Sequence, residues 1–186
     1  MANKKEAYLY ISAMLRAREP KMLTREKAEH MLDAQTFEDA AKTLTDCGYE
    51  DMSQMSAKAV ETALSEHRAK IFSEMSRLAP NKAIVDVFRV KYDYHNAKTI
   101  VKAEAMNTDP ASLLSDAGRM KGAALLTAYQ EDRTKEMPGR MGPAILEAKS
   151  VLARTGNPQL ADFVLDRAYF AELTDMAAAL DSRYLA

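Results

Sequence analysis

Apolar residues recur every three or four positions along most of the chain, and the positions between them are largely polar or charged. This spacing is typical of amphipathic α-helices. The first stretch, Glu6 to Arg18, ends before Pro20, a second begins near Thr24, and a third follows Thr36, which forms a capping-box pattern with Asp39. Gly48 then supplies a C-terminal stop. The predicted apolar faces of these helices contain Tyr8, Ile11, Leu15, Ala28, Met31, Leu32, Phe37, Ala40, Ala41 and Leu44.

A longer helix is predicted from Ser56 to Ala79, and Pro80-Asn81 separates it from a second long helix from Lys82 to Met106. The segment Ala83 to Val90, taken alone, also fits a strand, but the helical period continues past Lys98 and favours helix. We expect the two long helices to pack along one seam. The first helix would contribute Val60, Leu64, His67, Ile71, Met75 and Leu78, and the second Val87, Val90, Tyr94, Ala97 and Val101.

Turn-forming residues divide the second half of the chain into shorter helices. Asp109-Pro110 is expected to open a short helix that ends at Gly118, and another helix is predicted from Lys121 to Arg133. After a loop at Met137 to Pro143, a helix runs from Pro143 to Arg154. Asn157-Pro158 opens the last helix, whose apolar positions continue to the end of the chain: Leu160, Phe163, Val164, Phe170, Leu173, Met176, Leu180, Tyr184 and Leu185.

The pattern predicts an all-α fold built from stacked helical modules. Short capped helices follow the helix that contains Tyr8 and Leu15, and short capped helices follow again after the helix that contains Tyr94 and Ala97. This order indicates a loose repeat. We expect a first module at residues 1–80, a second at 81–164 and the start of a third at 165–186. Because the last apolar stripe has no stop signal, we expect the chain to be a fragment that lacks a partner helix.

Composition narrows the classes of function. The chain has 186 residues, 47% of them apolar and 28% charged, as in ordinary globular proteins. Its 26 basic and 27 acidic side chains give no basic footprint for nucleic acid. The apolar run Gly122 to Tyr129 is too short to span a membrane, and the first residues do not resemble a secretory signal. Cys47 is alone and is interpreted as a small buried hydrophobe rather than a reactive thiol.

Motifs that carry chemistry are missing from the sequence. The chain has no phosphate-binding G-x-x-x-x-G-K-[ST], no dinucleotide-binding G-x-G-x-x-G after a strand, and neither H-E-x-x-H nor C-x-x-C for zinc. His30, His67 and His95 fall on different predicted helices, so they would form a site only if the tertiary structure brought them together. We therefore assign no catalytic, cofactor-binding or metal-ligating residues and no cofactor.

One polar segment interrupts the apolar period: Lys91-Tyr92-Asp93-Tyr94-His95-Asn96-Ala97-Lys98. The simplest interpretation is a solvated helix face on which Asp93 pairs with nearby lysines. The alternatives are a hydrogen-bonded contact between modules and a ligand or proton site that includes His95. His67, on the predicted seam, is interpreted as a core histidine.

Three stretches together resemble the C subunits of V/A-type ATP synthases, which are homologous to the d subunits of eukaryotic V-ATPases. Residues 8–19 resemble the family's opening Y-x-Y-I-x-A-R-L-R-A-R-E, with Met14 at a position where Arg is common. Residues 91–98 resemble K-x-D-x-x-N-L-K, with Ala97 in place of Leu. Residues 165–170 resemble a third signature. The resemblance covers nearly the whole chain, although family members are considerably longer.

The resemblance implies a funnel of three helical modules with no transmembrane segment, held through protein contacts on the cytoplasmic face of the membrane. Such a protein would join the central shaft to the membrane rotor ring and carry torque between ATP chemistry and ion transport. It would not itself be an enzyme. A helical-repeat scaffold for an unrelated protein partner is the alternative function, and an enzyme or small-ligand binder in a helical cleft is a third.

Overall fold

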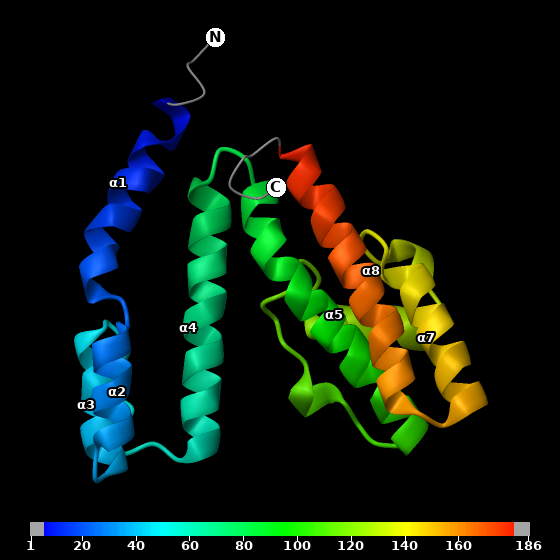
Figure 1. The fold of residues 1–186 in the computed structure, drawn as a ribbon, viewed down its shortest axis with the longest axis horizontal. Coiled ribbons are helices and arrows are strands. Elements are labelled where there is room, and N and C mark those ends of the chain that lie inside the picture. The colour runs from blue at the N-terminus through cyan, green and yellow to red at the C-terminus, as the bar shows by residue number, and fades with distance from the viewer. Residues whose placement is uncertain (1–5, 181–186) are drawn as a thin grey trace. The chain divides into compact units, whose positions relative to one another are not determined.

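The computed structural model describes residues 6–180 and shows α-helices and short 3₁₀ turns with no strand among them (Figure 1). The all-α prediction is confirmed. Contacts divide the chain into two compact units, Met1–Pro80 (unit 1) and Asn81–Ala186 (unit 2). The expected boundary at 80/81 coincides with this division, whereas the one at 164/165 falls inside a single helix. The repeat of three modules stays a prediction.

Unit 1 contains α1 (Leu9–Arg18), α2 (Arg25–Asp33), α3 (Phe37–Asp46) and the long α4 (Ala57–Leu78). The cap predicted at Thr36 is confirmed, and Thr24 and Ser56, near the predicted starts of their helices, are caps as well. Each of the three side chains accepts a hydrogen bond from a backbone N–H of the first turn. At α3 the Thr36 hydroxyl also donates to the Asp39 carboxylate over 2.7 Å. A turn with Gly48 at φ +88° follows α3, as predicted.

The seam predicted between the two long helices does not hold for the residues that α5 was expected to contribute. Within α4 only Ala63 is buried, and the predicted seam residues Leu64 and Ile71 are 36% and 41% exposed. Val90, Tyr94, Ala97 and Val101, which were expected to face them, belong to the hydrophobic core of unit 2 instead. The apolar period correctly identified an apolar face on each helix. The period does not indicate which other helix covers that face.

This correction changes the expected stability effect at Leu64. Leu64→Ala should lower the free energy of unfolding by less than about 1 kcal/mol, because the side chain already contacts solvent. Ile145→Ala, in the core of unit 2, should cost about 2–5 kcal/mol. Urea unfolding of both variants measures the two values. A loss of about 2 kcal/mol or more for Leu64→Ala would restore the predicted seam.

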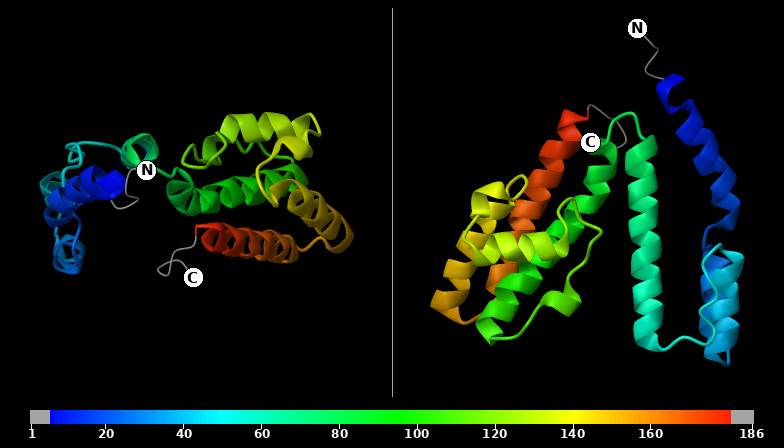
Figure 2. Two further views of the ribbon diagram at one scale, coloured as in Figure 1. Left: turned by 90° about the horizontal axis from the view of Figure 1, so that it is seen from above. Right: turned by 180° about the vertical axis from the view of Figure 1, so that it is seen from behind.

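Unit 2 consists of α5 (Ala83–Met106), α6 (Gly122–Gln130), α7 (Met141–Thr155) and α8 (Pro158–Ala179). Helices α5, α7 and α8 pack side by side, which both views in Figure 2 display. The strand alternative for the start of α5 is thereby excluded. The helices enclose the main hydrophobic core, which includes Val90, Tyr94, Ala97, Ile100, Val101, Leu125, Met141, Ile145, Leu152 and Leu165.

Three elements of unit 2 differ from the sequence prediction. The short helix expected between Pro110 and Gly118 is only a 3₁₀ turn, Ala111–Leu113, followed by an extended loop at residues 114–121. Asp109 does accept a hydrogen bond from the Ala111 N–H over 2.9 Å. Helix α6 ends at Gln130, short of the predicted Arg133, and α7 begins at Met141, two residues before the predicted start.

The apolar stripe predicted along the last helix is split between core and surface. Leu173 and Met176 pack against the core of unit 2, whereas Phe163 and Phe170 are 58% and 61% exposed. Tyr184 and Leu185, the last positions of the predicted stripe, lie outside the described residues. Helix α8 therefore packs against α5 and α7.

Candidate functional site: a buried charge network in unit 2

The polar segment at residues 91–98 lies in the middle of α5, and half of it is buried. Asp93, Tyr94, Asn96 and Ala97 are at most 2% exposed. The interpretation as a solvated face is therefore wrong for Asp93 and Asn96, which contact the loop 114–121 instead. Only His95, together with Lys91 at the start of the segment, has an exposed side chain.

Arg119, in the loop between α5 and α6, lies between two buried carboxylates. Its Nε is 2.6 Å from Oδ2 of Asp93, and its Nη1 is 2.6 Å from Oε1 of Glu172 on α8. Asp93 also accepts a hydrogen bond from the Met120 N–H over 3.2 Å. One guanidinium group thus ties the loop to two helices that lie far apart in the sequence, which suits arginine because its donors are held in a fixed fork.

Glu172 has further partners. Its Oε2 accepts hydrogen bonds from the Tyr94 hydroxyl over 2.7 Å and from the Arg140 N–H over 2.9 Å. Gly139, with φ +61°, lies against this carboxylate so closely that a Cβ there would stand 1.8 Å from Glu172 Oε1. The network therefore extends from α5 through α8 to the loop that precedes α7.

Burial changes the acid–base properties of these groups. Removal from water raises the pKa of the Asp93 carboxyl, and its contacts with Arg119 only partly oppose this shift. Burial, together with the hydrogen bond to Glu172, raises the pKa of the Tyr94 hydroxyl far above its ordinary value, so Tyr94 stays neutral and donates. Burial alone would lower the pKa of Arg119, but its carboxylate partners outweigh that effect and raise it.

A second set of hydrogen bonds fixes the same loop. Asn96 donates to the Ser115 carbonyl and accepts from the Ser115 N–H, each over 2.8 Å. Arg89 donates to the carbonyls of Ala117 and Gly118. These bonds satisfy backbone groups that a helix would otherwise have paired internally, and they explain why the segment after Leu113 is a loop.

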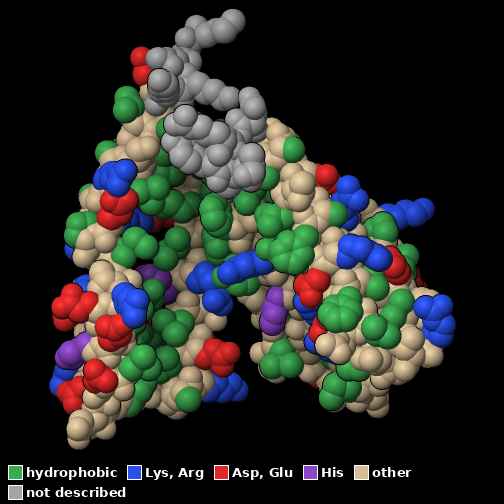
Figure 3. All heavy atoms as spheres, viewed as in Figure 1, with side chains coloured by type: hydrophobic (Ala, Val, Ile, Leu, Met, Phe, Trp, Pro, Cys, Tyr) green, Lys and Arg blue, Asp and Glu red, His purple; other side chains and the backbone are tan. Residues whose placement is uncertain are grey.

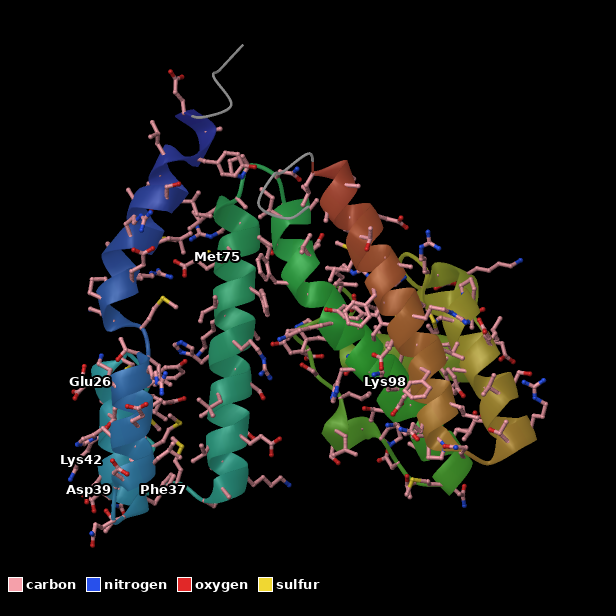
Figure 4. All side chains as sticks on the ribbon, in the orientation of Figure 1. Glu26, Phe37, Asp39, Lys42, Met75 and Lys98 are labelled. Atoms are coloured by element: carbon pink, nitrogen blue, oxygen red, sulfur yellow. The ribbon has the colours of Figure 1, made fainter. Side chains whose placement is uncertain are left out.

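The segments that resembled known signatures contact each other in unit 2. Lys98 of α5, which is labelled in Figure 4, pairs with Asp166 of α8 over 2.6 Å, and Lys102 pairs with Asp162 over 3.0 Å. Leu165, beside Asp166, is fully buried. The first signature, on α1, is largely exposed, and its Arg18 forms a double hydrogen bond with Glu74 of α4 over 2.7 and 2.8 Å.

The remaining candidate residues do not converge. His30 contacts the Thr43 hydroxyl at 3.4 Å, His67 packs its ring against Tyr49, and His95 lies in the other unit. Cys47 is half-buried, with the Lys27 ammonium 3.6 Å from its sulfur. Within residues 6–180, no three His, Cys, Asp or Glu side chains are grouped so that they could hold a metal ion. Within residues 6–180, the charged side chains that lie close together form ion pairs and not an open reactive centre.

Sequence reasoning missed Arg119 and Glu172. The available signal was Asp93 itself, because a carboxylate three residues after Val90 and four before Ala97 falls on the apolar face and needs a buried cation. Nothing in the sequence identifies which arginine or lysine meets it.

Comparison of the sequence with known protein families identifies the family of this chain. The model for the ATP synthase (C/AC39) subunit matches residues 11–185. The chain belongs to the ATP synthase C/AC39 subunit family. The resemblance that the three signatures indicated is thereby confirmed.

Curated relatives are named as members of the same family. The C subunit of the V-type sodium ATPase of Enterococcus hirae is 24% identical over 166 residues, which cover 89% of this chain and 51% of the relative. The C subunit of the A-type ATP synthase of Thermococcus kodakarensis is 28% identical over 120 residues, covering 61% and 33%. This C/AC39 chain thus spans about half the length of the first relative and less of the second. No solved structure matches it significantly.

In this C/AC39 chain, none of the described helices is both long and apolar enough to cross a bilayer. Two of the three signatures, residues 91–98 and residues 165–170, therefore have a structural role. They hold α5, α8 and the loop 114–121 together as one body.

Proposed function

We propose that this chain is a non-catalytic coupling subunit of a V/A-type rotary ATPase, which links the cytoplasmic shaft to the membrane ion-translocating ring. The observation that carries the proposal is the family match over residues 11–185. The relatives are named as subunits of a sodium ATPase and of ATP synthases, so the expected partners are the other subunits of such a complex. The proposed location is the cytoplasmic face of the membrane, held by protein contacts.

The packing of unit 2 suits a part that transmits force. Its helices share one core, and its ion pairs join segments distant in the sequence. Fixed packing resists deformation, because side chains in a close-packed interior have few alternative arrangements. A coupling piece needs this stiffness and does not need reactive groups.

Unit 1 has the properties of a binding surface. Its buried apolar residues are few and mostly small: Ile11, Ala41, Met52, Ala63 and Ala79. Large apolar side chains remain exposed on its helices and turns, including Leu9, Tyr10, Leu15, Met22, Leu23, Leu32 and Phe37, and apolar side chains reach the surface of these helices in Figure 3. Extensive apolar exposure of this kind marks protein–protein contact sites. We assign the contacts with neighbouring ATPase subunits to this unit.

Affinity capture tests the partners. The tagged protein, recovered from its own cells after mild solubilisation of the membranes, should bring down the shaft and rotor-ring subunits together. Leu32→Glu, at an 85% exposed position of unit 1, should weaken the capture, whereas Leu146→Glu, 52% exposed on α7, should leave it unchanged. Stoichiometric recovery of an unrelated protein without ATPase subunits would favour the scaffold alternative.

The isolated chain should not bind nucleotide. It lacks a phosphate-binding loop, so ATP with magnesium should leave its melting temperature unchanged. A binder saturated at a hundredfold excess over its dissociation constant would gain about 2.7 kcal/mol of stability. A reproducible upward shift, confirmed by titration calorimetry, would contradict the non-catalytic assignment.

A further inference from the structure

Helices α2 and α3 of unit 1 pack against each other and, with the turn that follows them, form an acidic hairpin at residues 25–51. This segment contains eight acidic side chains and three basic ones, a net charge of −5, whereas the whole chain has a net charge of −1. All eight acidic residues are exposed, and acidic side chains are visible over the two helices in Figure 3. The rest of the chain is net positive, so negative charge is concentrated on this hairpin.

The basic side chains of the acidic hairpin do not neutralise its surface. The Arg25 guanidinium pairs with the Glu29 carboxylate over 2.8 Å. The Lys42 ammonium is 3.3 Å from the carboxylate of Glu38 and 3.4 Å from that of Asp39, and Figure 4 labels Lys42 and Asp39 on α3. Within residues 6–180, four acidic side chains of the hairpin have no ion-pair partner: Glu26, Asp33, Asp46 and Glu50.

Two large apolar side chains lie within this acidic surface. Leu32, near the end of α2, is 85% exposed, and Phe37, at the start of α3, is 52% exposed. Glu29 precedes Leu32 by three positions and Asp33 follows it directly, so carboxylates flank Leu32 on the exposed face of α2. A partner that covers these side chains removes apolar surface from water, which favours binding.

The charge around Leu32 indicates the chemistry of such a partner. Anionic membrane surfaces and nucleic acids carry negative charge, so the acidic hairpin repels them. A protein segment with lysine or arginine beside large apolar side chains fits both features of the surface. Its cations would face the carboxylates, and its apolar groups would cover Leu32 and Phe37.

We propose that the acidic hairpin is a docking surface for a basic segment of another protein, with Leu32 and Phe37 as the apolar contacts. The proposal rests on the proposed function, because a neighbouring ATPase subunit would supply that segment. It adds the part of unit 1 that binds and the charge of its partner. Complementary charge speeds association and selects the partner, whereas the apolar contacts hold the bound segment.

Fluorescence anisotropy of the full chain with two synthetic probes tests the charge of the partner. One probe is a labelled helical peptide of leucine, alanine and lysine, and the other has glutamate in place of every lysine. The lysine probe should bind at least about tenfold more tightly, and added salt should weaken its binding, because salt screens the attraction between charges. Equal affinity for the two probes would overturn the proposal.

Two double variants with the same change of charge locate the bound probe. Glu26→Gln with Asp33→Asn neutralises two unpaired carboxylates of the hairpin, whereas Glu61→Gln with Glu66→Gln neutralises two exposed carboxylates of α4 in the same unit. The hairpin variant should bind the lysine probe roughly threefold or more weakly, and the α4 variant should bind it unchanged. Leu32→Ser should weaken binding at low and at high salt, because apolar contact is not screened. Equal losses in the two double variants would place the probe elsewhere and overturn the proposal.

The same double variants separate this inference from the proposed function when they are used in the affinity capture. The hairpin variant should recover less of the ATPase subunits than the unaltered protein, and the α4 variant should recover as much. If the unaltered protein recovers no ATPase subunit, the proposed function fails, and probe binding still decides whether the hairpin takes a basic segment. If the unaltered protein and the hairpin variant recover ATPase subunits equally, the docking surface is wrong and the coupling role stands.

Discussion

Arg119→Met is expected to lower the free energy of unfolding by about 3–5 kcal/mol, the range observed when one partner of a buried ion pair is removed. The substitution keeps an unbranched side chain of similar reach but removes the donors that meet Asp93 and Glu172. Both carboxylates then lose their cation while remaining in the core. Urea unfolding, followed by circular dichroism because the fold is helical, gives the loss directly.

The matched control is Arg167→Met on α8. Arg167 pairs with Glu147 over 2.6 Å, but both side chains are more than half exposed, and exposed pairs contribute at most about 1 kcal/mol. Adding Asp93→Asn and Glu172→Gln to Arg119→Met should recover part of the loss, since neutral side chains need no cation. A loss below about 1 kcal/mol for Arg119→Met would show that the network does not stabilise unit 2.

Gly139→Ala is expected to cost more than about 3 kcal/mol, although it adds only a methyl group. Gly139 has φ +61°, where a side chain costs roughly 1–2 kcal/mol, and the added Cβ would overlap Glu172 at 1.8 Å. Glu172 would have to move, and the hydrogen bonds from Tyr94 and Arg140 would be lost with it.

Gly156→Ala separates the two causes. Gly156 ends α7 with nearly the same backbone angle, φ +64°, but nothing lies within 4 Å of its added Cβ. Its cost should therefore be the backbone strain alone, roughly 1–2 kcal/mol. Thermal or urea unfolding of both variants gives the difference between them. Equal losses would mean that Glu172 is not held against Gly139.

Most of the helices were predictable because their signals are local. Residues such as Thr36, Ser56 and Asn157 cap helices through hydrogen bonds that span two or three positions. Apolar spacing correctly placed Tyr94 and Ala97 in the core. Such features depend on neighbours in the chain, so the sequence contains them in full.

The features that the sequence did not predict depend on contacts between residues that are distant in the chain. The loop after Leu113 replaces a predicted helix because Asn96, 19 positions before Ser115, supplies the hydrogen bonds that fix it. The seam expected along α5 was wrong because an apolar stripe does not identify the helix that covers it, and the α5 stripe packs within unit 2. The candidate site was only half visible: Asp93 stood on the apolar face, but its link to Glu172 through Arg119 required the tertiary structure.

The two units suggest a division of work within the proposed coupling protein. Unit 2 has the larger core and the charge network, which suit a stiff part. Unit 1 has few buried apolar residues and many exposed apolar side chains, which suit binding, although some large apolar side chains of unit 2 are exposed as well. A coupling piece needs both properties, because torque passes only through a body that is rigid and firmly attached to its neighbours.

The most direct test of the coupling role is ATP-driven ion transport in membrane vesicles from cells with and without this protein. The proposal predicts that vesicles lacking it retain ATP hydrolysis by the catalytic head but lose ATP-driven ion transport, and that adding back the full-length protein restores transport. Vesicles shown to be free of the protein that still transport ions at the original rate per ATP hydrolysed would contradict it.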